Sequence, residues 1–322
     1  MDRAVRIASL WNWLPTFRAV AEQEHVTRAA EQLGVSPSAV SRMVSLLEDD
    51  IGQPLFHRVG RSIQLNAAGR HLLGGVRSAM RMVDESLAVL ADRQYVGAVR
   101  IACEEPMLRA LVMPTLARLR RAHPALTPEL RALGDVDVAA ALLQGDLDVV
   151  FCRSSPSRDH VTVRRLGTLE GAVYAGPGHP LRDVATCGVT DVLGHGFVTV
   201  TGRPAGWPAA YRRQSVLAVA DLDVAAEVAA AESLLVVLPT VVAARHRAAG
   251  RDLAPVPLRG VIPPVEYYAV CREQLELPGR AETVIDAVAE GFASVEGAVP
   301  ATSKGDAPSS SAAAATVAEP PP

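Results

Sequence analysis

The sequence lacks the features that mark several large protein classes. The longest apolar run, residues 234–244, contains Pro239 and is too short to span a bilayer. No CxxC pair is present, which excludes a zinc ribbon or a disulfide scaffold and is typical of reduced thiols in the cytosol. We therefore expect a cytoplasmic protein without membrane contact. The cysteines lie far apart, at Cys103, Cys152, Cys187 and Cys271.

The residue patterns of common enzymes and metal sites are also missing. There is no GxGxxG that opens a helix, no phosphate-binding GxxxxGK, no HExxH and no GxSxG. The histidines are scattered, without the spacing of metal ligands. We therefore expect neither an enzyme nor a metal, and no cofactor.

Positive charge is scarce over the whole chain but locally concentrated. The net charge of −3 excludes a histone-like basic protein. Residues 51–83 nevertheless contain five arginines and no acid, whereas residues 96–322 have 21 basic against 25 acidic residues. The acid-free stretch is either a solvated helix face or the edge of a nucleic-acid surface. A DNA-binding motif beside it would favour the second reading.

Such a motif is predicted immediately before this stretch. Apolar residues at helical spacing over 14–21 predict a first helix. A second helix is predicted to begin with Thr27 as its N-cap and to end in a left-handed turn at Gly34. Ser36 as N-cap, followed by a proline, predicts a third helix over 37–48.

The third predicted helix has one face that suits a DNA groove. Its inner stripe is apolar, and the opposite face carries short polar side chains and one arginine. Short side chains let the backbone approach phosphates, while Arg42 can reach a phosphate or a guanine. The alternative is a helical hairpin in an ordinary core. The predicted DNA-binding residues of the motif are Thr27, Arg28, Ser36, Pro37, Ser38, Ser41, Arg42 and Ser45.

A short hairpin is predicted over 54–65, with Arg58 and Arg61 at its tip. A basic hairpin after a helix-turn-helix is a wing, which contacts the phosphate backbone or the minor groove. Arg58 and Arg61 therefore complete the predicted DNA interface.

The motif resembles the LysR-type transcriptional regulator family. The resemblance lies in TRAAEQL at 27–33, VSPSAVSR at 35–42 and LLEDDIGQPLFHR at 46–58. It continues in later motifs, such as MPTLARL at 113–119, and covers about residues 13–297. The family usually has other residues at the start of the recognition helix, so base specificity does not follow from the resemblance.

Residues 69–95 are predicted to form a linker helix. Its apolar residues follow one another at spacings of 3, 4, 3, 4 and 3, which is a coiled-coil seam and implies a partner helix. The alternative is packing against the chain's own core. The resemblance implies a homodimer, a homotetramer formed as a dimer of dimers, and contact with RNA polymerase. The predicted dimerisation residues are Leu73, Val76, Met80, Val83, Leu87 and Leu90.

From Gly97 onward, predicted strands alternate with helices, which favours a parallel sheet built from βαβ units. The resemblance implies a two-lobed, periplasmic-binding-protein-like α/β domain. Its first lobe would hold residues 96–170 and the segment after Tyr267, and its second lobe residues 171–265.

Ligands of such sheets bind beyond the carboxyl ends of the strands, here between the lobes. The family commonly has small or hydroxyl residues where Glu104 and Glu105 stand. Because these acids disfavour a carboxylate, we expect an effector that is not a simple organic anion, or no classical effector. The predicted effector-binding residues are Glu104, Glu105, Arg153, Ser154, Thr199, Thr201 and Asp221.

The sequence thus predicts an α/β chain with a winged helix-turn-helix at 1–68, the linker helix, a regulatory domain at 96–297 and a disordered Ala/Pro/Ser-rich tail at 298–322. The predicted function is a sequence-specific transcription regulator that binds double-stranded operator DNA and senses a small-molecule effector. The alternative is a small-molecule-binding protein or an enzyme whose N-terminal unit serves assembly.

Overall fold

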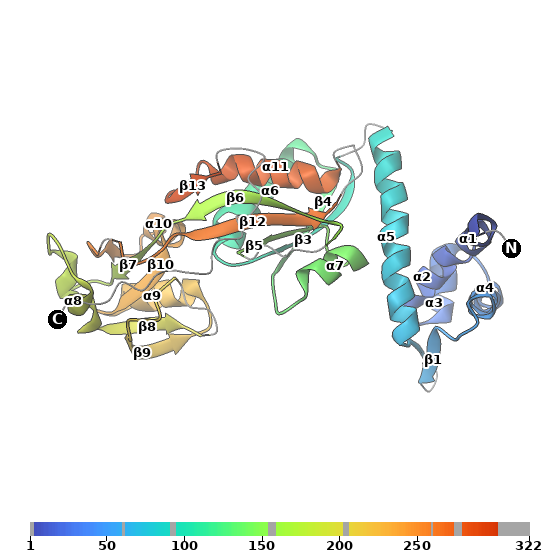
Figure 1. Cartoon of the computed structure of the whole chain (residues 1–322), viewed down its shortest axis with the longest axis horizontal. Coiled ribbons are helices and arrows are strands. Elements are labelled where there is room, and N and C mark those ends of the chain that lie inside the picture. Colours follow the sequence, from blue (N-terminus) through green and yellow to red (C-terminus); the bar gives the residue numbers. More distant parts are fainter. Residues whose placement is uncertain are drawn as a thin grey trace. The chain divides into compact units, whose positions relative to one another are not determined.

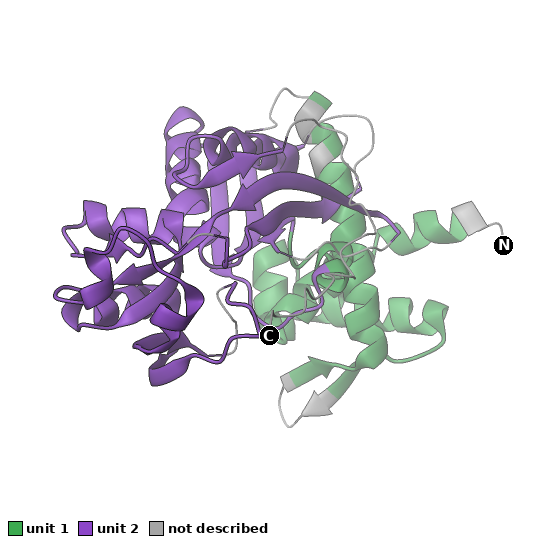
Figure 2. Cartoon of the chain, turned by 60° about the vertical axis from the view of Figure 1, so that its left-hand side comes forward, with its two compact units in different colours: residues 1–93, 139–147 green, residues 94–138, 148–322 purple. Residues whose placement is uncertain are grey.

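The structure, a computed structural model, divides the chain into two compact units (Figure 2). Unit 1 holds residues 1–93 and 139–147, and unit 2 holds residues 94–138 and 148–322. The start of the predicted disordered tail is corrected, because Ala298–Pro300 form a strand paired with Gly167–Leu169, and the tail lies outside the described residues from position 302 onward. The described residues are 3–59, 62–90, 95–153, 159–201, 206–258, 260–273 and 279–301.

Unit 1 begins with helices that form a helix-turn-helix (Figure 1). The predicted capping of α4 is confirmed, because Ser36 Oγ accepts a hydrogen bond from the backbone N–H of Ala39 at 3.2 Å. Gly34 has the predicted left-handed conformation, with φ of 67°. The four helices are α1 (Arg3–Trp11), which was not predicted, α2 (Leu14–Gln23), α3 (Val26–Leu33) and α4 (Pro37–Ile51).

One predicted cap is wrong. Helix α3 begins at Val26, so His25 takes the N-cap position and Thr27 lies inside the first helical turn. The side chain of His25 makes no capping bond. The hydroxyl of threonine made it a reasonable candidate, but His25, two residues earlier, already adopts the extended backbone of a cap.

Small side chains set the spacing of the three helices. Ala29 and Ala30 of α3 are almost fully buried, together with Val20 of α2 and Val40 of α4. Because alanine occupies little volume, α3 lies close against both neighbours, and a short turn is enough to connect it to α4.

A two-stranded hairpin follows, made of β1 (Phe56–Val59) and β2 (Ser62–Leu65). Glu48 of α4 fixes its base, since Glu48 Oε1 accepts hydrogen bonds from the backbone N–H of Leu55 at 2.6 Å and of Phe56 at 3.3 Å. The predicted wing is therefore tied to the C-terminal half of α4.

Helix α5 (Ala67–Leu90) is the predicted linker helix, and its apolar stripe has two different environments. Leu73 and Val76 are buried against Phe17, Leu47 and Leu55 of the same chain, and Met80 packs at the edge of this cluster. The expectation that the whole apolar stripe pairs with a second subunit is therefore corrected for Leu73 and Val76, which pack within their own chain. The residues that remain exposed are Val83, Leu87 and Leu90.

Unit 2 contains two sheets, which form two lobes as expected. The six-stranded sheet has the order β13-β6-β12-β5-β3-β4 and comprises β3 (Gly97–Cys103), β4 (Leu126–Ala132), β5 (Val149–Cys152), β6 (Val161–Leu169), β12 (Val265–Arg272) and β13 (Ala298–Pro300). The five-stranded sheet has the order β11-β7-β10-β8-β9 and comprises β7 (Gly171–Ala175), β8 (Gly196–Val200), β9 (Gln214–Val219), β10 (Leu235–Pro239) and β11 (Ala254–Pro255).

The expected parallel sheet is corrected to a mixed one. Strand β3 runs parallel to β4 and β5, and β8 runs parallel to β9 and β10. Strand β12 is antiparallel to β5 and β6, and β10 is antiparallel to β7. Strands β7 and β12, which begin at the lobe crossings, thus run against the strands of the βαβ units.

Helices cover both sheets (Figure 1). In β10, Leu235 and Val237 pack into one apolar cluster, while Val236 and Leu238 pack into another, so both faces of the strand are buried and its sequence is continuously apolar. No helix among the described residues is long and apolar enough to cross a bilayer. The remaining helices are η1 (Leu108–Val112), α6 (Met113–Ala122), α7 (Val138–Gln144, mostly grouped with unit 1), η2 (Pro180–Arg182), α8 (Val189–Leu193), α9 (Leu222–Ala231), α10 (Thr240–Ala248) and α11 (Arg280–Phe292).

A cluster of charged side chains joins the two lobes. Asp223 of α9 forms an ion pair with Arg109 of η1, which belongs to the first lobe, with Nε and Oδ2 at 3.0 Å. The other oxygen of Asp223 contacts Arg245 and lies 2.9 Å from Nε2 of His246, both on α10. One carboxylate therefore binds groups from both lobes.

Replacing Gly69 by alanine is predicted to destabilise unit 1. A Cβ there would lie 2.1 Å from the carbonyl oxygen of Leu55, so the start of α5 would have to move, at a cost of about 1–3 kcal/mol. Gly75→Ala is the matched control, because its Cβ meets nothing within 4 Å and alanine favours the helix by about 0.5–1 kcal/mol. Urea unfolding measures both variants, and equal stability changes would contradict the close approach.

Acidification is predicted to destabilise unit 2 through His246. Burial, then the charge of Arg245, lowers the pKa of His246, so the folded state binds fewer protons than the unfolded state, in which histidine titrates near 6.5. The free energy of unfolding therefore falls as the pH drops through about 6.5, by at most about 1.4 kcal/mol per pH unit. Urea unfolding at pH 7.5 and 5.5 should show a smaller loss for His246→Gln than for the unaltered chain. Burial also lowers the pKa of His179, but this contribution is common to both proteins and cancels in the comparison.

Candidate functional site

The first half of α4 presents a polar, exposed surface on unit 1. Val40 and Leu47 are fully buried on the inner side of the helix. The opposite side carries exposed serines and Arg42, without any large apolar group at its N-terminal end. The predicted DNA-binding residues of the motif are all exposed: Thr27 and Arg28 on α3, Ser36 at the N-cap of α4, and Pro37, Ser38, Ser41, Arg42 and Ser45 on α4.

The positive charge on this surface is not neutralised within the described residues. Neither Arg28 nor Arg42 forms an ion pair in that part of the chain. Other arginines of unit 1 form ion pairs with its acidic residues away from this surface, for example Arg6 with Asp50 at 3.0 Å. The α4 surface can therefore offer guanidinium groups to an anion.

The structure describes only one of the two predicted DNA-binding arginines of the wing. Arg58 lies on β1, two residues after Phe56, and Arg61 lies outside the described residues. The backbone register of the hairpin, with Phe56 opposite Leu65 and Val59 opposite Ser62, is the expected one for a hairpin with its tip at 60–61.

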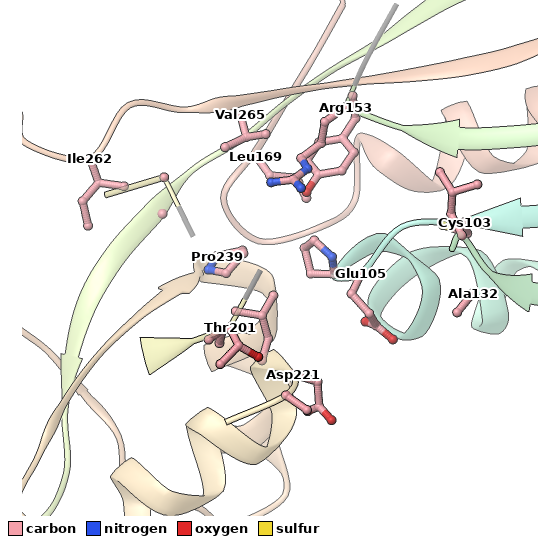
Figure 3. A pocket seen from close by; sticks show the side chains of 18 of the residues that line it. Cys103, Glu105, Ala132, Arg153, Leu169, Thr201, Asp221, Pro239, Ile262 and Val265 are labelled. Atoms are coloured by element: carbon pink, nitrogen blue, oxygen red, sulfur yellow. The ribbon is translucent and has the colours of Figure 1, made fainter. Parts of the chain in front are cut away.

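Unit 2 contains a cavity of about 360 Å³ between its two lobes (Figure 3). Parts of both sheets and both crossings between the lobes contribute to its wall. Its lining residues are Cys103, Glu105, Pro106, Ala132, Leu133, Gly134, Asp135, Arg153, Leu169, Glu170, Gly171, Val200, Thr201, Gly206, Ala220, Asp221, Leu222, Pro239, Ile262, Pro263, Val265 and Tyr267.

The structure brings four of the seven predicted effector residues to this cavity: Glu105, Arg153, Thr201 and Asp221. Glu104 is buried beside the cavity wall, and its Oε2 accepts a hydrogen bond from Arg153 Nε at 2.7 Å.

The other two predicted effector residues do not line the cavity in the described structure. Thr199 is half-buried on β8, where its hydroxyl lies 2.6 Å from that of Ser215. Ser154 lies outside the described residues.

Sequence reasoning missed Asp135, Glu170 and the crossing residues near Ile262. Asp135 follows the carboxyl end of β4, so the rule that selected Glu105 would also have selected it. Glu170 and Ile262 carry no local signal, because they reach the cavity only through the path of the chain between the lobes.

Cys103, the cysteine among the described lining residues, is not activated as a nucleophile. Burial raises the pKa of the Cys103 thiol well above its ordinary value, and Glu105 and Glu104 raise it further. Within the described residues, His, Cys, Asp and Glu side chains form no group of three that could hold a metal ion.

Comparisons with known proteins agree with this geometry. Among curated relatives, an uncharacterised HTH-type transcriptional regulator of Bacillus subtilis, YybE, is 28% identical over 58% of this chain and 65% of its own length. An Escherichia coli regulator, YnfL, is 35% identical over 43% of this chain and 48% of its own length. The matches thus span about half to two thirds of these relatives.

A solved structure shares the fold. Full-length OxyR from Pseudomonas aeruginosa is 17% identical, with a TM-score of 0.67 over 91% of this chain and 98% of that one. The family model described as the bacterial regulatory helix-turn-helix protein of the lysR family matches residues 11–70. The model described as the LysR substrate binding domain matches residues 92–293. The chain therefore belongs to the LysR family, whose members among these relatives are named transcriptional regulators.

Proposed function

We propose that the chain is a sequence-specific DNA-binding transcription regulator whose regulatory domain binds a small-molecule effector. The observation that carries the proposal is the α4 surface, where exposed serines and Arg42 stand opposite the buried Val40 and Leu47. A helix that only packed in a core would not keep a whole face of short polar side chains and free guanidinium groups exposed. Residues 1–68 would form the DNA-binding domain and residues 96–297 the effector domain.

In this proposal the first half of α4 enters the major groove of operator DNA. Ser38 and Ser41 are short enough to let the helix backbone approach the groove floor, and Arg42 reaches a phosphate or a guanine edge. Arg58 and Arg61 of the wing would contact the phosphate backbone. The N-terminus of α4, capped by Ser36, adds a partial positive charge toward a phosphate.

The effector would bind in the cavity between the lobes of unit 2. Glu105 of the first lobe and Asp221 of the second both line this cavity, so a ligand that touches both changes the energy of lobe closure. The Arg109–Asp223 ion pair already joins the lobes, so effector binding acts on an existing contact between them.

The exposed end of α5 is proposed to pair with α5 of a second subunit. Val83, Leu87 and Leu90 are 46%, 60% and 80% exposed and fall on one stripe, continuous with the buried Val76. Burying such a stripe in a homodimer removes apolar surface from water and supplies two recognition helices for a palindromic site.

Arg42→Ala is predicted to weaken binding to operator DNA. If Arg42 contacts a phosphate, the loss affects all sequences and flattens the slope of log K against log salt by about one unit. If it contacts a guanine, specificity at that base pair relaxes. Mobility-shift titrations on the DNA upstream of the gene at several salt concentrations measure both the salt dependence and the sequence specificity of binding. Arg118→Ala, an exposed arginine on α6 of unit 2, is the matched control; equal effects of the two substitutions would contradict the proposed interface.

Leu87→Glu is predicted to dissociate the dimer. Burying an unpaired carboxylate in the apolar stripe should raise the dimer dissociation constant at least about tenfold. Met82→Glu introduces the same charge at an exposed apolar position five residues earlier, which faces another side of α5. Sedimentation velocity measures the oligomeric state of both variants. A dimer that survives Leu87→Glu would exclude this stripe as the interface.

A further inference from the structure

We infer that the cavity of unit 2 binds a small, mainly apolar molecule that carries a protonated amine. The inference rests on the proposed effector function and specifies the ligand class of that same site. It depends on the charge of the cavity wall, on the pairing of its one arginine and on the apolar character of the remaining surface.

Acidic side chains outnumber basic ones around the cavity. Four lining residues are carboxylates, and Arg153 is the one basic residue among the described lining residues. A cleft with walls of one charge sign concentrates ligands of the opposite sign. The four carboxylates are Glu105, Asp135, Glu170 and Asp221.

Arg153 does not reverse this balance. Its Nε donates to Glu104 Oε2 at 2.7 Å, and only 9% of the Glu104 side chain is exposed. A buried carboxylate this close to the guanidinium cancels its charge, so Arg153 can offer hydrogen-bond donors but no net charge to an organic anion. Glu105 is paired as well, because its Oε1 lies 3.2 Å from Arg109 Nε, whereas Asp135, Glu170 and Asp221 form no ion pair within the described residues. A carboxylate ligand in the cavity would therefore face net repulsion from these three groups.

The carboxylates come from separate elements that meet at the cavity. Glu105 follows β3 and Asp135 follows the adjacent parallel strand β4, while Asp221 precedes α9 in the other lobe. Figure 3 shows Glu105 and Asp221 as two parts of one cavity wall. An ammonium group, with three N–H donors, can bind carboxylates from both lobes at once.

The rest of the wall selects an apolar skeleton. Most of the lining side chains near the two lobe crossings are aliphatic or proline, among them Leu169, Val200, Pro239, Ile262 and Val265. A volume of about 360 Å³ suits a small organic molecule. A polyamine with several charges would leave polar groups against this apolar surface without partners.

The test uses the purified full chain and three probes with one skeleton: cyclohexylmethylamine, cyclohexanecarboxylate and cyclohexylmethanol. Isothermal titration at pH 7 should detect the amine, with at least about tenfold weaker binding of the carboxylate and the alcohol, because each lacks a charge-assisted hydrogen bond to the wall. The benzyl series with the same three head groups repeats the comparison on a second skeleton.

Substitutions then locate the site. Asp221→Asn keeps the capping ability of the side chain but removes its charge, and should weaken amine binding about tenfold. Glu105→Gln should weaken it as well. Glu232→Gln, an exposed acid of the same lobe that does not line the cavity, should leave it unchanged.

Each other outcome overturns the inference. Tighter binding of the carboxylate, equal binding of the alcohol, no binding of either amine, or equal effects of Asp221→Asn and Glu232→Gln would exclude an amine-selective cavity. Mobility shifts on upstream DNA are measured with the same preparations. Retained specific DNA binding then shows that the ligand class alone failed, whereas loss of both shows that the proposed regulator function failed.

Discussion

The architecture of the regulatory unit depends on how the chain crosses between its two sheets. Strand β6 ends at Leu169 and β7 begins at Gly171, so Glu170 alone connects one lobe to the other there. Its backbone N–H donates to the carbonyl of Gly297, and its carbonyl accepts from the N–H of Thr240. A connection this short, bonded on both sides, restricts the lobes to rotations about the crossing, and the cavity lies against it.

This constraint explains why the cavity is both charged and apolar. The carboxyl ends of β3, β4 and β9 bring polar loops from the two lobes, while the crossings bring aliphatic side chains such as Leu169 and Val265. The Glu104–Arg153 pair completes the wall at the carboxyl ends of β3 and β5. A ligand bound in this cavity, as proposed, would therefore contact the same residues that connect the lobes.

Local features of both units were predictable from the sequence. The caps at Ser36 and Gly34 and the hairpin of the wing depend on neighbouring residues, whose preferences act over one or two turns. Four of the seven proposed effector residues line the cavity for a similar reason, because a strand end is a local signal. The two-lobed division came from the resemblance to the family.

Long-range features were not predictable from spacing. The periodicity of α5 is the same along its length, yet Leu73 and Val76 pack against residues as distant as Phe17, while Leu90 is exposed. Which partner covers an apolar stripe depends on the path of the whole chain. The antiparallel directions of β7 and β12 were missed for the same reason, since an isolated strand carries no sign of its direction.

The divided role of α5 also sets a rule for protein engineering. A hybrid that joins the helices of unit 1 to a foreign domain could not be connected directly after the β1–β2 hairpin, because Leu73 and Val76 complete the core beneath α2 and α4. A junction beyond Met80 would keep that core intact and leave only the exposed stripe to be matched to the new partner. The core of unit 1 thus ends inside a continuous helix rather than at a loop.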